Sequence, residues 1–600
     1  MVKILRYLVR KFYLLCAVVL IGAAVLVQGG RSLAPLIQHY PDQVAHYLGQ
    51  QLDLDVTLGA INAHWEGLKP RLSLHDLRVY DRDGNPLLKA ERTSLELSLV
   101  ASLLRRQLVW GEIGVHSAHL SLTQNETGAW SVLDREAQPE GTALGGVWSL
   151  VQRGTRVEFQ DTRLHLDLAK SDNLEVVAPR LLLESSGDFH RLSLHVNIAE
   201  HSDALRLVVE GHGDPSDARR FRAKGHLELR NVPLLESMAA LEETLWGENE
   251  RSEWFRHGRA NARLWFDKLA DEDGYRLRGH LALDDLTLPI QGTELRSLTT
   301  NVTGQWTRED QWLLALQELS ALLGEQTLPP VNLGATLAAP GAPAQVMVDR
   351  LDLRYWADLV DQLGLLGDGV LYEVIHTLQP RGELHNVQLT LPLGDLKDWE
   401  LAAQLHQVSV EPWNQVPGFT DVSGFVTASR AGGRIDLDSR DGFGMYYAGT
   451  YNEPMRYQQA NGQVAWHLRP DDNQIYVNSG PLNLIGEGES ARGAFWLSLP
   501  WERNTGDIDL YIQVATEQMA APLYAKYLPA VLPETLTTWL HKSLGRTNSG
   551  RATAGDFIFR GTINSSSEMA RSHQLYLAFE QARLKYDPQW PELNRGKGRL

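Results

Sequence analysis

Three oxygen-bearing side chains stand at alternate positions in the segment "DRDGNP": Asp81, Asp83 and Asn85. Side chains at this spacing bind calcium in EF-hand loops, where a glutamate at the twelfth position completes the ligand set. Arg92 stands at that position here. The segment also fits a hairpin turn, because Asp-Gly and Asn-Pro pairs favour turns. Of the two interpretations, calcium loop and turn, we favour the turn.

Other patterns that could support catalysis are incomplete. Ser171–Asn173 spells the SDN of penicillin-binding enzymes, but no S-x-x-K accompanies it. The 20 histidines lie singly along predicted strands, mostly on the polar face. Two carboxylates for glycoside hydrolysis would be hard to recognise by spacing, and none of the 74 acidic residues stands out as a pair. We therefore predict a protein that is not an enzyme, with no catalytic residues, no metal ligands and no cofactor.

The composition narrows the class of protein. Hydrophobic residues make up 43% and charged residues 22% of the 600 positions, an ordinary globular balance. The net charge is −17 and no long basic run lies beyond the N-terminus, so we predict no nucleic-acid partner. The single cysteine, Cys16, excludes an intrachain disulfide and a cysteine-built zinc site. Its context, "FYLLC", lacks the small residues that precede a lipidated bacterial cysteine.

The N-terminus indicates a membrane anchor. A basic flank precedes an uncharged run of 16 residues, Phe12–Val27, which lies between the length of a signal-peptide core and the roughly 20 residues of a full span. No A-x-A site follows, although cleavage after Gly29 is conceivable. We expect an uncleaved anchor, with a cleaved signal as the alternative; either way the flank stays cytoplasmic and the chain after Gly30 is exported. The anchor residues are Phe12, Leu14, Leu15, Val18, Val19, Leu20, Ile21, Val25, Leu26 and Val27, and the topology-setting residues are Lys3, Arg6, Arg10 and Lys11.

Three regions are expected along the chain. Residues 1–30 form the basic flank and anchor. Residues 31–51 have apolar side chains at helical spacing and predict an amphipathic helix that caps the next region or lies on the membrane. Residues 52–600 read as β-structure, interrupted by helices at Leu234–Arg256, Tyr355–Leu378 and Ala520–Leu544, the last with Pro533 as a first helical residue.

From Leu52 onward, apolar and polar residues alternate with the period of a strand. Turn signals such as Asp441-Gly442 separate the alternating segments. The apolar members of four such segments are candidates for one continuous lipid-facing surface. They are Leu192, Leu194, Val196, Ile198, Leu277, Leu281, Leu283, Ile508, Leu510, Ile512, Val514, Leu575 and Leu577.

The alternation skips one residue at the same place in five segments. In "GHLALDDLTL" two polar residues separate Leu283 from Leu286, and "GHLELRNVPL", "LSLHDLRV", "LHNVQL" and "LHQVSV" repeat this rhythm. An extra residue would turn every later side chain to the other face unless a β-bulge absorbs it. Ordinary strand ends with hairpin turns are the alternative. Five copies favour bulges in a repeated architecture.

These patterns predict one long, twisted, mainly antiparallel β-sheet with a few inserted helices. Alternating strands usually have one packed and one solvated face. The sequence from residue 52 onward contains no clear linker, so a chain of separately closed sandwiches fits it less well than a sheet whose apolar face lines an open groove. An apolar face that the chain leaves uncovered needs another molecule on it, and acyl chains are the obvious candidate.

Several segments resemble a known family. Leu68–Leu133 is similar to the opening of AsmA-like proteins, and "VPGFTDVSG", "YLPAVLPETLTTWLHKSLGR", "FIFRG" and "LKYDPQWPEL" resemble the large YhdP-like members. The resemblance covers nearly the whole chain, although its motifs are patterned β-segments and not a catalytic signature. It implies a protein anchored in the inner membrane of Gram-negative bacteria, with its bulk in the periplasm, that conducts phospholipid to the outer membrane.

The resemblance also bears on the length of the chain, its partners and an alternative function. Because YhdP-like chains are longer, we expect residues 52–600 to be a groove truncated at its C-terminal end. Expected partners are phospholipids, the inner membrane and an unidentified outer-membrane or periplasmic partner. The alternative function is a periplasmic scaffold for outer-membrane β-barrel proteins, which would use exposed strand edges and not the apolar face.

Overall fold

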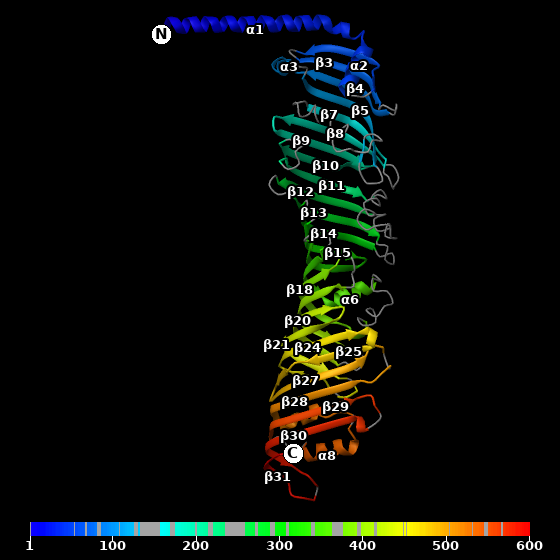
Figure 1. Cartoon of the computed structure of the whole chain (residues 1–600), viewed down its shortest axis with the longest axis vertical. Helices are drawn as coiled ribbons and strands as arrows, with labels where there is room; N and C mark the ends of the chain where they lie inside the picture. Colours follow the sequence, from blue (N-terminus) through cyan, green and yellow to red (C-terminus); the bar gives the residue numbers. More distant parts are fainter. Residues whose placement is uncertain are drawn as a thin grey trace. The chain divides into compact units, whose positions relative to one another are not determined.

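The computed structural model is mostly β, with a long N-terminal helix and few other helices (Figure 1). It describes residues 2–52, 55–66, 69–80, 86–106, 109–124, 130–131, 156–167, 174–198, 201–213, 220–234, 258–269, 274–287, 294–307, 311–337, 342–362, 376–392, 398–412, 417–447, 449–451, 453–502, 505–530, 532–544, 550–565, 568–587 and 589–599. The expected fold class is confirmed. Asp81–Asn85 and Ser171–Asn173 lie outside the described residues.

The chain divides into two compact units. Unit 1 comprises residues 1–308 and 318–329, and unit 2 comprises residues 309–317 and 330–600. All strands are assigned to one hydrogen-bonded sheet. Two strands, β15 (Trp312–Leu323) and β16 (Gln326–Leu337), contain residues of both units.

The remaining strands follow in chain order. Those of unit 1 are β1 (Asp55–Thr57), β2 (Ala60–Glu66), β3 (Lys69–Tyr80), β4 (Pro86–Leu97), β5 (Trp110–Gln124), β6 (Trp130–Ser131), β7 (Arg156–Asp167), β8 (Leu174–Ser186), β9 (Phe189–Ile198), β10 (His201–His212), β11 (Arg222–Pro233), β12 (Arg259–Leu269), β13 (Gly274–Thr287) and β14 (Glu294–Thr307). Those of unit 2 are β17 (Ala344–Asp352), β18 (Arg381–Leu391), β19 (Glu400–Val410), β20 (Gly418–Ser429), β21 (Gly432–Ser439), β22 (Phe443–Tyr446), β23 (Met455–Tyr457), β24 (Gln459–Arg469), β25 (Gln474–Ser479), β26 (Leu482–Gly486), β27 (Glu489–Pro500), β28 (Asp509–Ala520), β29 (Arg551–Thr562), β30 (Arg571–Leu584) and β31 (Leu593–Arg599).

The strands of unit 1 follow one another across the sheet. β3 pairs with β1, β2 and β4, and each strand from β7 to β14 pairs antiparallel with the next. Among the pairings described in unit 1, the one between β5 and β7 is parallel. Because neighbouring strands pair in this order, side chains that point to the same face of the sheet form rows that run across the strands.

Unit 2 has the same plan with an insertion. Strands β16 to β20 and β27 to β31 pair successively and antiparallel. Between them β20 pairs with both β21 and β22, and β24 pairs with β21, β25 and β26. The short strands β22 and β23 therefore form a hairpin added to the side of the main ladder.

The predicted helices are partly described. Within the described residues the α-helices are α1 (Val2–Ile37), α2 (Pro41–Leu52), α3 (Leu99–Arg105), α6 (Leu353–Gln362) and α8 (Glu534–Leu544), and the 3-10 helices are η3 (Pro470–Asp472), η4 (Ala521–Tyr527) and η5 (Glu568–Ala570). The expected helix Leu234–Arg256 falls outside the described residues beyond Leu234. The expected helix Ala520–Leu544 divides into η4 and α8, and Pro533 lies one position before α8, where its carbonyl accepts hydrogen bonds from the backbone of Leu536 and Thr537.

All five skipped positions have the backbone of a bulge. The second polar residue of each has a positive φ, namely Asp76 (51°), Asn231 (50°), Asp285 (55°), Asn386 (50°) and Gln407 (49°). The apolar face resumes afterwards: Leu74 before the skip and Leu77 after it both belong to clusters that include Leu58 and Ile113. The prediction that bulges preserve one apolar face is confirmed for this strand.

Neighbouring side chains cap several of these bulges. A left-handed residue turns its N–H away from the regular ladder, so the N–H needs another acceptor. The Gln407 N–H donates to Ser423 Oγ at 3.1 Å, and the Asn231 N–H donates to Asn261 Oδ1 at 2.8 Å. Small polar residues on the next strand thus stabilise the bulged conformation.

Candidate functional site

A continuous row of directly paired residues crosses unit 1 on the apolar face. Paired residues of neighbouring strands point to the same side of a sheet. Apart from Thr93 and Gly279, every member of this row is hydrophobic. From β2 to β14 the row is Ile61, Leu74, Thr93, Val115, Phe159, Leu181, Leu194, Leu207, Leu227, Leu264, Gly279 and Val302.

A second row lies beside the first, two residues away along each strand. It consists of Ala63, Leu72, Leu95, Ile113, Val157, Leu183, Leu192, Val209, Gly225, Phe266, Leu277 and Gly304. Gly225 accommodates the ring of Phe266, since a Cβ there would lie 2.2 Å from Phe266 Cζ. Together the two rows form the unit 1 apolar track.

Unit 2 has a comparable row on its apolar face. Trp466, Val477, Leu497, Leu510 and Gly561 are paired in succession from β24 to β29. Leu497 belongs to a buried cluster with Ile475 and Leu499, against which Ile508 and Leu510 pack. The predicted residues Ile512 and Val514 continue this face on β28, and Val514 leads through Phe557 to Leu575 on β30.

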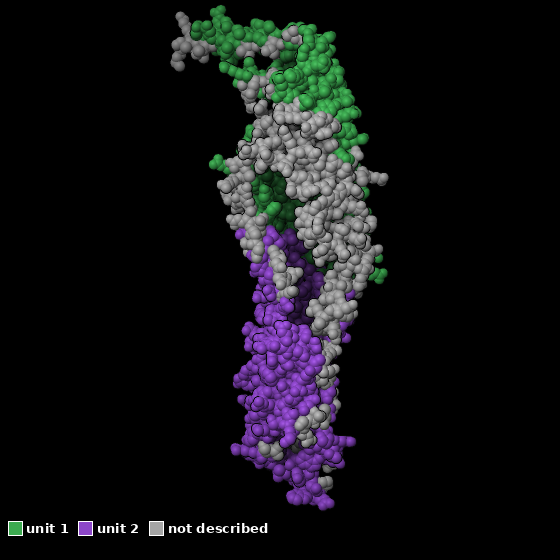
Figure 2. All heavy atoms as spheres, turned by 45° about the vertical axis from the view of Figure 1, so that its right-hand side comes forward, with its two compact units in different colours: residues 1–308, 318–329 green, residues 309–317, 330–600 purple. Residues whose placement is uncertain are grey.

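Most of the candidate lipid-facing residues are half-buried. Of the thirteen, Val196 is buried, Leu575 is 57% exposed, and the rest are half-buried. Figure 2 shows a recess in the surface of unit 1 (green) and another in that of unit 2 (purple). The partial exposure of the apolar face is given by the half-buried residues themselves, and not by these recesses.

The N-terminal end of the unit 1 track is covered. Val44 and Leu48 of α2 pack against a buried cluster of Ile61, Leu74 and Leu95. The expected amphipathic segment 31–51 thus supplies contacts that close one end of the apolar face. It does so from α2, which begins at Pro41 after a short turn that follows α1.

The opposite face of unit 1 is polar, and its charges alternate in sign along one row except at the adjacent carboxylates Glu96 and Glu112. One row reads Arg71, Glu96, Glu112, Arg156, Glu184, Arg191, Glu210, Lys224, Asp267 and Arg276. The Glu96 carboxylate accepts hydrogen bonds from Lys69 at 2.6 Å and Arg71 at 2.9 Å. Burial alone would raise the pKa of Glu96, but these two cations outweigh it and hold that pKa below its usual value.

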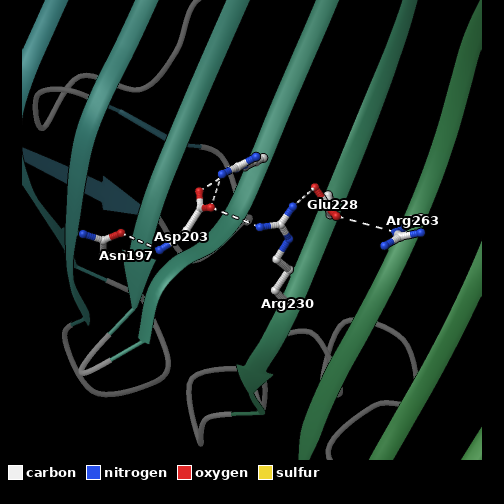
Figure 3. Close-up of polar contacts among 6 residues, drawn as sticks. Asn197, Asp203, Glu228, Arg230 and Arg263 are labelled. Carbon is white, nitrogen blue, oxygen red and sulfur yellow. Dashed lines mark hydrogen bonds and ion pairs between the residues drawn. The ribbon is translucent and has the colours of Figure 1, made fainter.

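A second polar network joins β9, β10, β11 and β12 (Figure 3). The Asp203 N–H donates to Asn197 Oδ1, while its carboxylate accepts from Arg230 at 3.2 Å. Arg230 also donates to Glu228 at 2.9 Å, and Arg263 lies 3.5 Å from the same carboxylate. Hydrogen bonding from Arg206 lowers the pKa of Asp203, and hydrogen bonding from Arg230 lowers that of Glu228. These charges satisfy one another and tie four strands together.

A pocket of about 170 Å³ opens on the polar face, lined by Arg71, Ser94, Glu96, Glu112, Gly114, His116, Glu158 and Gln160. Glu158 accepts hydrogen bonds from Arg156, Gln160 and Arg180, so this carboxylate too belongs to the charge network. Within the described residues, no group of three or more His, Cys, Asp or Glu is placed to hold a metal ion.

Sequence reasoning missed a buried ion pair on the apolar face of unit 2. The side chain of Glu489 is only 4% exposed and accepts hydrogen bonds from Lys526 and, at 2.6 Å, from the Tyr527 hydroxyl. Lys526 lies 3.9 Å from the centroid of the Tyr457 ring and donates to the Arg456 carbonyl at 2.7 Å. η4 is thereby fixed over a cluster of Leu437, Phe443, Met455, Tyr457 and Ala460. One feature of the sequence could have indicated it. Along β27, Glu489 lies an even number of residues before Phe495 and Leu497, so its side chain points to the same apolar face.

The N-terminal helix α1 contains the segment that the sequence predicts to be the membrane anchor. Within α1, Val9–Ile37 is long and apolar enough to cross a membrane. Phe12, Leu14, Leu15, Val18, Leu20, Ile21 and Val25 are all exposed, and Val27 is half-buried. Lys11 Nζ lies 5.6 Å from the Tyr7 ring centroid, and Arg6 and Arg10 are exposed. α1 meets the sheet where Gly30 lies against the ring of Trp65.

Comparison with known proteins agrees with this architecture. The sequence profile of the YhdP protein family matches residues 1–600. The chain is 20% identical to the intermembrane phospholipid transporter YhdP of Escherichia coli K12 over 624 aligned positions. The alignment covers 96% of this chain but 45% of that relative, so the chain spans less than half of its length. No solved structure gives a significant match.

Proposed function

Because this chain belongs to the YhdP family, we propose that it conducts phospholipid between the inner and outer membranes along its apolar sheet face. The observation that carries the proposal is the succession of paired, mostly apolar residues through twelve strands of unit 1, which are half-buried from β7 to β13. The E. coli relative that bears the name of an intermembrane phospholipid transporter supports the same substrate class.

The magnitude of the hydrophobic effect explains why such a face is sufficient. Each methylene exposed to water costs about 0.8 kcal/mol, so an acyl chain of about sixteen carbons costs on the order of 13 kcal/mol. A row of Leu, Val and Phe side chains removes this cost without any chemical step. Because the contacts are similar from strand to strand, a lipid can move from one strand to the next without being held in a deep energy minimum.

We place the anchor in the inner membrane, with the N-terminus in the cytoplasm and the rest of the chain in the periplasm. The apolar stretch Val9–Ile37 and the basic residues before it support this orientation. Phospholipids, the inner membrane and a further partner at the outer membrane are then the expected partners.

The Glu489–Lys526 pair sets a condition on this path. Tyr527 packs against the apolar cluster of unit 2, so η4 covers the face there. Acyl chains must leave the face before this cluster, or pass it while η4 is displaced.

Lipid extraction tests the proposal. We expect the chain, purified in a mild detergent, to carry near-stoichiometric or higher amounts of phospholipid when its extract is measured by mass spectrometry. Lipid-free protein that instead captures outer-membrane β-barrel precursors would overturn the conduit and favour the scaffold.

A further inference from the structure

The short helix α3 exposes a group of large aliphatic side chains. Val100 is 68% exposed, and Leu103 and Leu104 are each 79% exposed. Residues three and four positions apart lie on one side of a helix, so these three side chains form a single apolar surface, the α3 face. Tyr13 of α1, the helix that we place in the membrane, is 70% exposed by comparison. Apolar side chains gathered on one exposed surface mark a contact with another molecule or with a membrane.

The polar side of α3 is the side that binds the rest of the protein. The Val109 N–H donates to Ser102 Oγ at 2.9 Å, and the Ser98 N–H donates to the Val109 carbonyl at 2.9 Å. Val109 is buried, and both serines are half-buried. A surface helix of a globular protein normally packs its apolar side against the core and leaves its polar side in water. α3 has the reverse arrangement, so the sheet does not cover the α3 face.

The strand register places α3 at the end of the sheet where α1 arrives. α3 directly follows β4, whose last residue, Leu97, pairs with Trp110 at the start of β5 (Figure 1). β2 ends on the same side, since Trp65 pairs with Pro70 near the start of β3, and β3 runs antiparallel to β4. The ring of Trp65 is the one that lies against Gly30 of α1. Within unit 1, α3 and the C-terminal part of α1 therefore meet the same end of the first strands.

This end of the sheet lies close to the membrane boundary expected for α1. The uncharged run of the anchor ends at Val27, and Gly30 follows three residues later, about 4.5 Å along the helix axis. Two strand spacings of about 4.8 Å separate β2 from β4, so a membrane that contains α1 is within reach of α3. Arg106 directly follows α3 and is exposed. A cation beside an apolar helix face is typical of helices that lie on anionic membranes.

We propose that α3 lies in the surface of the bilayer that α1 crosses, with the α3 face among the upper acyl chains and Arg106 at the level of the lipid phosphates. The position beside α1 and the adjoining positive charge favour the bilayer over a protein partner as the occupant. This second contact holds the N-terminal end of unit 1 against the membrane, so the sheet cannot turn freely about α1. The inference rests on the proposed placement of α1 in the membrane and does not depend on lipid conduction.

Bromolipid quenching tests this contact in the full chain, reconstituted in nanodiscs of phosphatidylcholine and phosphatidylglycerol. A Cys16→Ser background carries one bimane fluorophore, attached through Leu104→Cys, Lys89→Cys or Leu20→Cys. Lys89 is exposed near the opposite end of β4 and is the aqueous reference, while Leu20 lies inside the anchor and is the membrane reference. We expect bromination of the acyl chains to quench the Leu104→Cys label several-fold more than the Lys89→Cys label, and aqueous iodide to do the reverse.

The outcomes separate the α3 contact from the anchor. Quenching of the Leu20→Cys label by bromolipid without quenching of the Leu104→Cys label overturns the α3 contact and leaves the anchor in place. Quenching of neither label overturns both. A Leu104→Cys label that is shielded from iodide but not quenched by bromolipid would show that protein covers the α3 face, and this result also overturns the proposal.

A second experiment removes the apolar side chains themselves. With the bimane attached through Val100→Cys, the double change Leu103→Asp and Leu104→Asp should abolish quenching by bromolipid, because a carboxylate is costly to transfer out of water. Met569→Asp is the control, since Met569 is 98% exposed on η5 of unit 2 and its replacement should leave the quenching unchanged. Undiminished quenching in the double variant would contradict the proposal. Unchanged circular dichroism and melting temperature confirm that each variant is folded.

Discussion

The hydroxyl of Tyr527 donates a 2.6 Å hydrogen bond to the carboxylate of Glu489 on the apolar face of unit 2. The same carboxylate is paired with Lys526, whose side chain is 19% exposed. A buried carboxylate is tolerated only with such partners, because desolvation of an unpaired charge is costly. The short segment η4 therefore holds its position over the sheet through a polar contact in apolar surroundings.

Removing one partner of this pair should destabilise unit 2. We expect Lys526→Met to lower the free energy of unfolding by about 3 kcal/mol, since Glu489 then keeps the Tyr527 contact but loses its cation. The double variant Glu489→Leu with Lys526→Met should recover most of the loss. Urea unfolding followed by tryptophan fluorescence measures both; a double variant no more stable than the single one would contradict this view.

Alkaline pH should weaken the same region. Burial raises the pKa of Tyr457 to about 12, and burial also raises the pKa of Tyr527. Between about pH 10 and pH 12 the native state keeps the Tyr457 proton that the unfolded chain has lost, so the free energy of unfolding falls by as much as about 1.4 kcal/mol per pH unit. Urea titrations across this pH range should show a shallower decline for Tyr457→Phe. The exposed Tyr576→Phe is the control, and an identical slope in wild type and Tyr457→Phe would refute the assignment.

The bulges make a prediction about backbone conformation. Gln407 has a φ of 49°, a region that β-branched residues avoid and glycine adopts freely. Gln407→Val should cost about 1–2 kcal/mol of stability, whereas Gln407→Gly should be neutral or slightly stabilising. Thermal melting compares them with Gln388→Val, an exposed strand residue with no positive φ. Equal losses of stability for valine at both positions would show that the left-handed backbone of Gln407 does not contribute to the effect.

Much of the fold followed from periodicity. The apolar alternation predicted the strands, and the skipped positions predicted β-bulges, which the structure has at Asp285 and Asn386 with a left-handed backbone. These features are local, since a strand has to keep one face apolar along its own length. The long N-terminal helix was evident for the same reason, from an uncharged run.

Contacts between distant segments could not be predicted in this way. Glu489 meets Lys526 only because η4 folds back over the sheet, and Lys268 faces Tyr275 and Trp306 only through the register of three strands. The parallel pairing of β5 with β7 and the added hairpin of β22 and β23 also depend on tertiary packing. Alternation within a strand says which face a residue occupies, but not which residue of another strand lies beside it.

Membrane attachment can be tested directly. If Val9–Ile37 spans the membrane uncleaved, the protein should remain in the inner-membrane fraction after carbonate washing, and its mature N-terminus should begin at Met1 or Val2. Replacing Leu15 and Leu20 with arginine should release it or block its insertion, because each charge at the centre of a span costs about 2.5–3.5 kcal/mol. A mature chain beginning near Gly30 would instead identify a cleaved signal.

The central claim, that lipid lies on the apolar face, is tested most directly by the lipid bound to Leu283→Arg and Leu510→Arg. Both leucines are half-buried on the apolar faces of their units, Leu510 within its row and Leu283 four residues beyond Gly279 on β13, so an arginine there can reach water but places a charge in the lipid path. We expect near-normal abundance and a several-fold loss of bound phospholipid, whereas His280→Arg and Asp509→Arg, on the opposite face, should bind as much lipid as wild type. Leucine variants that accumulate and retain full lipid loading would contradict the account, and variants lost to proteolysis would show that these residues belong to a closed core.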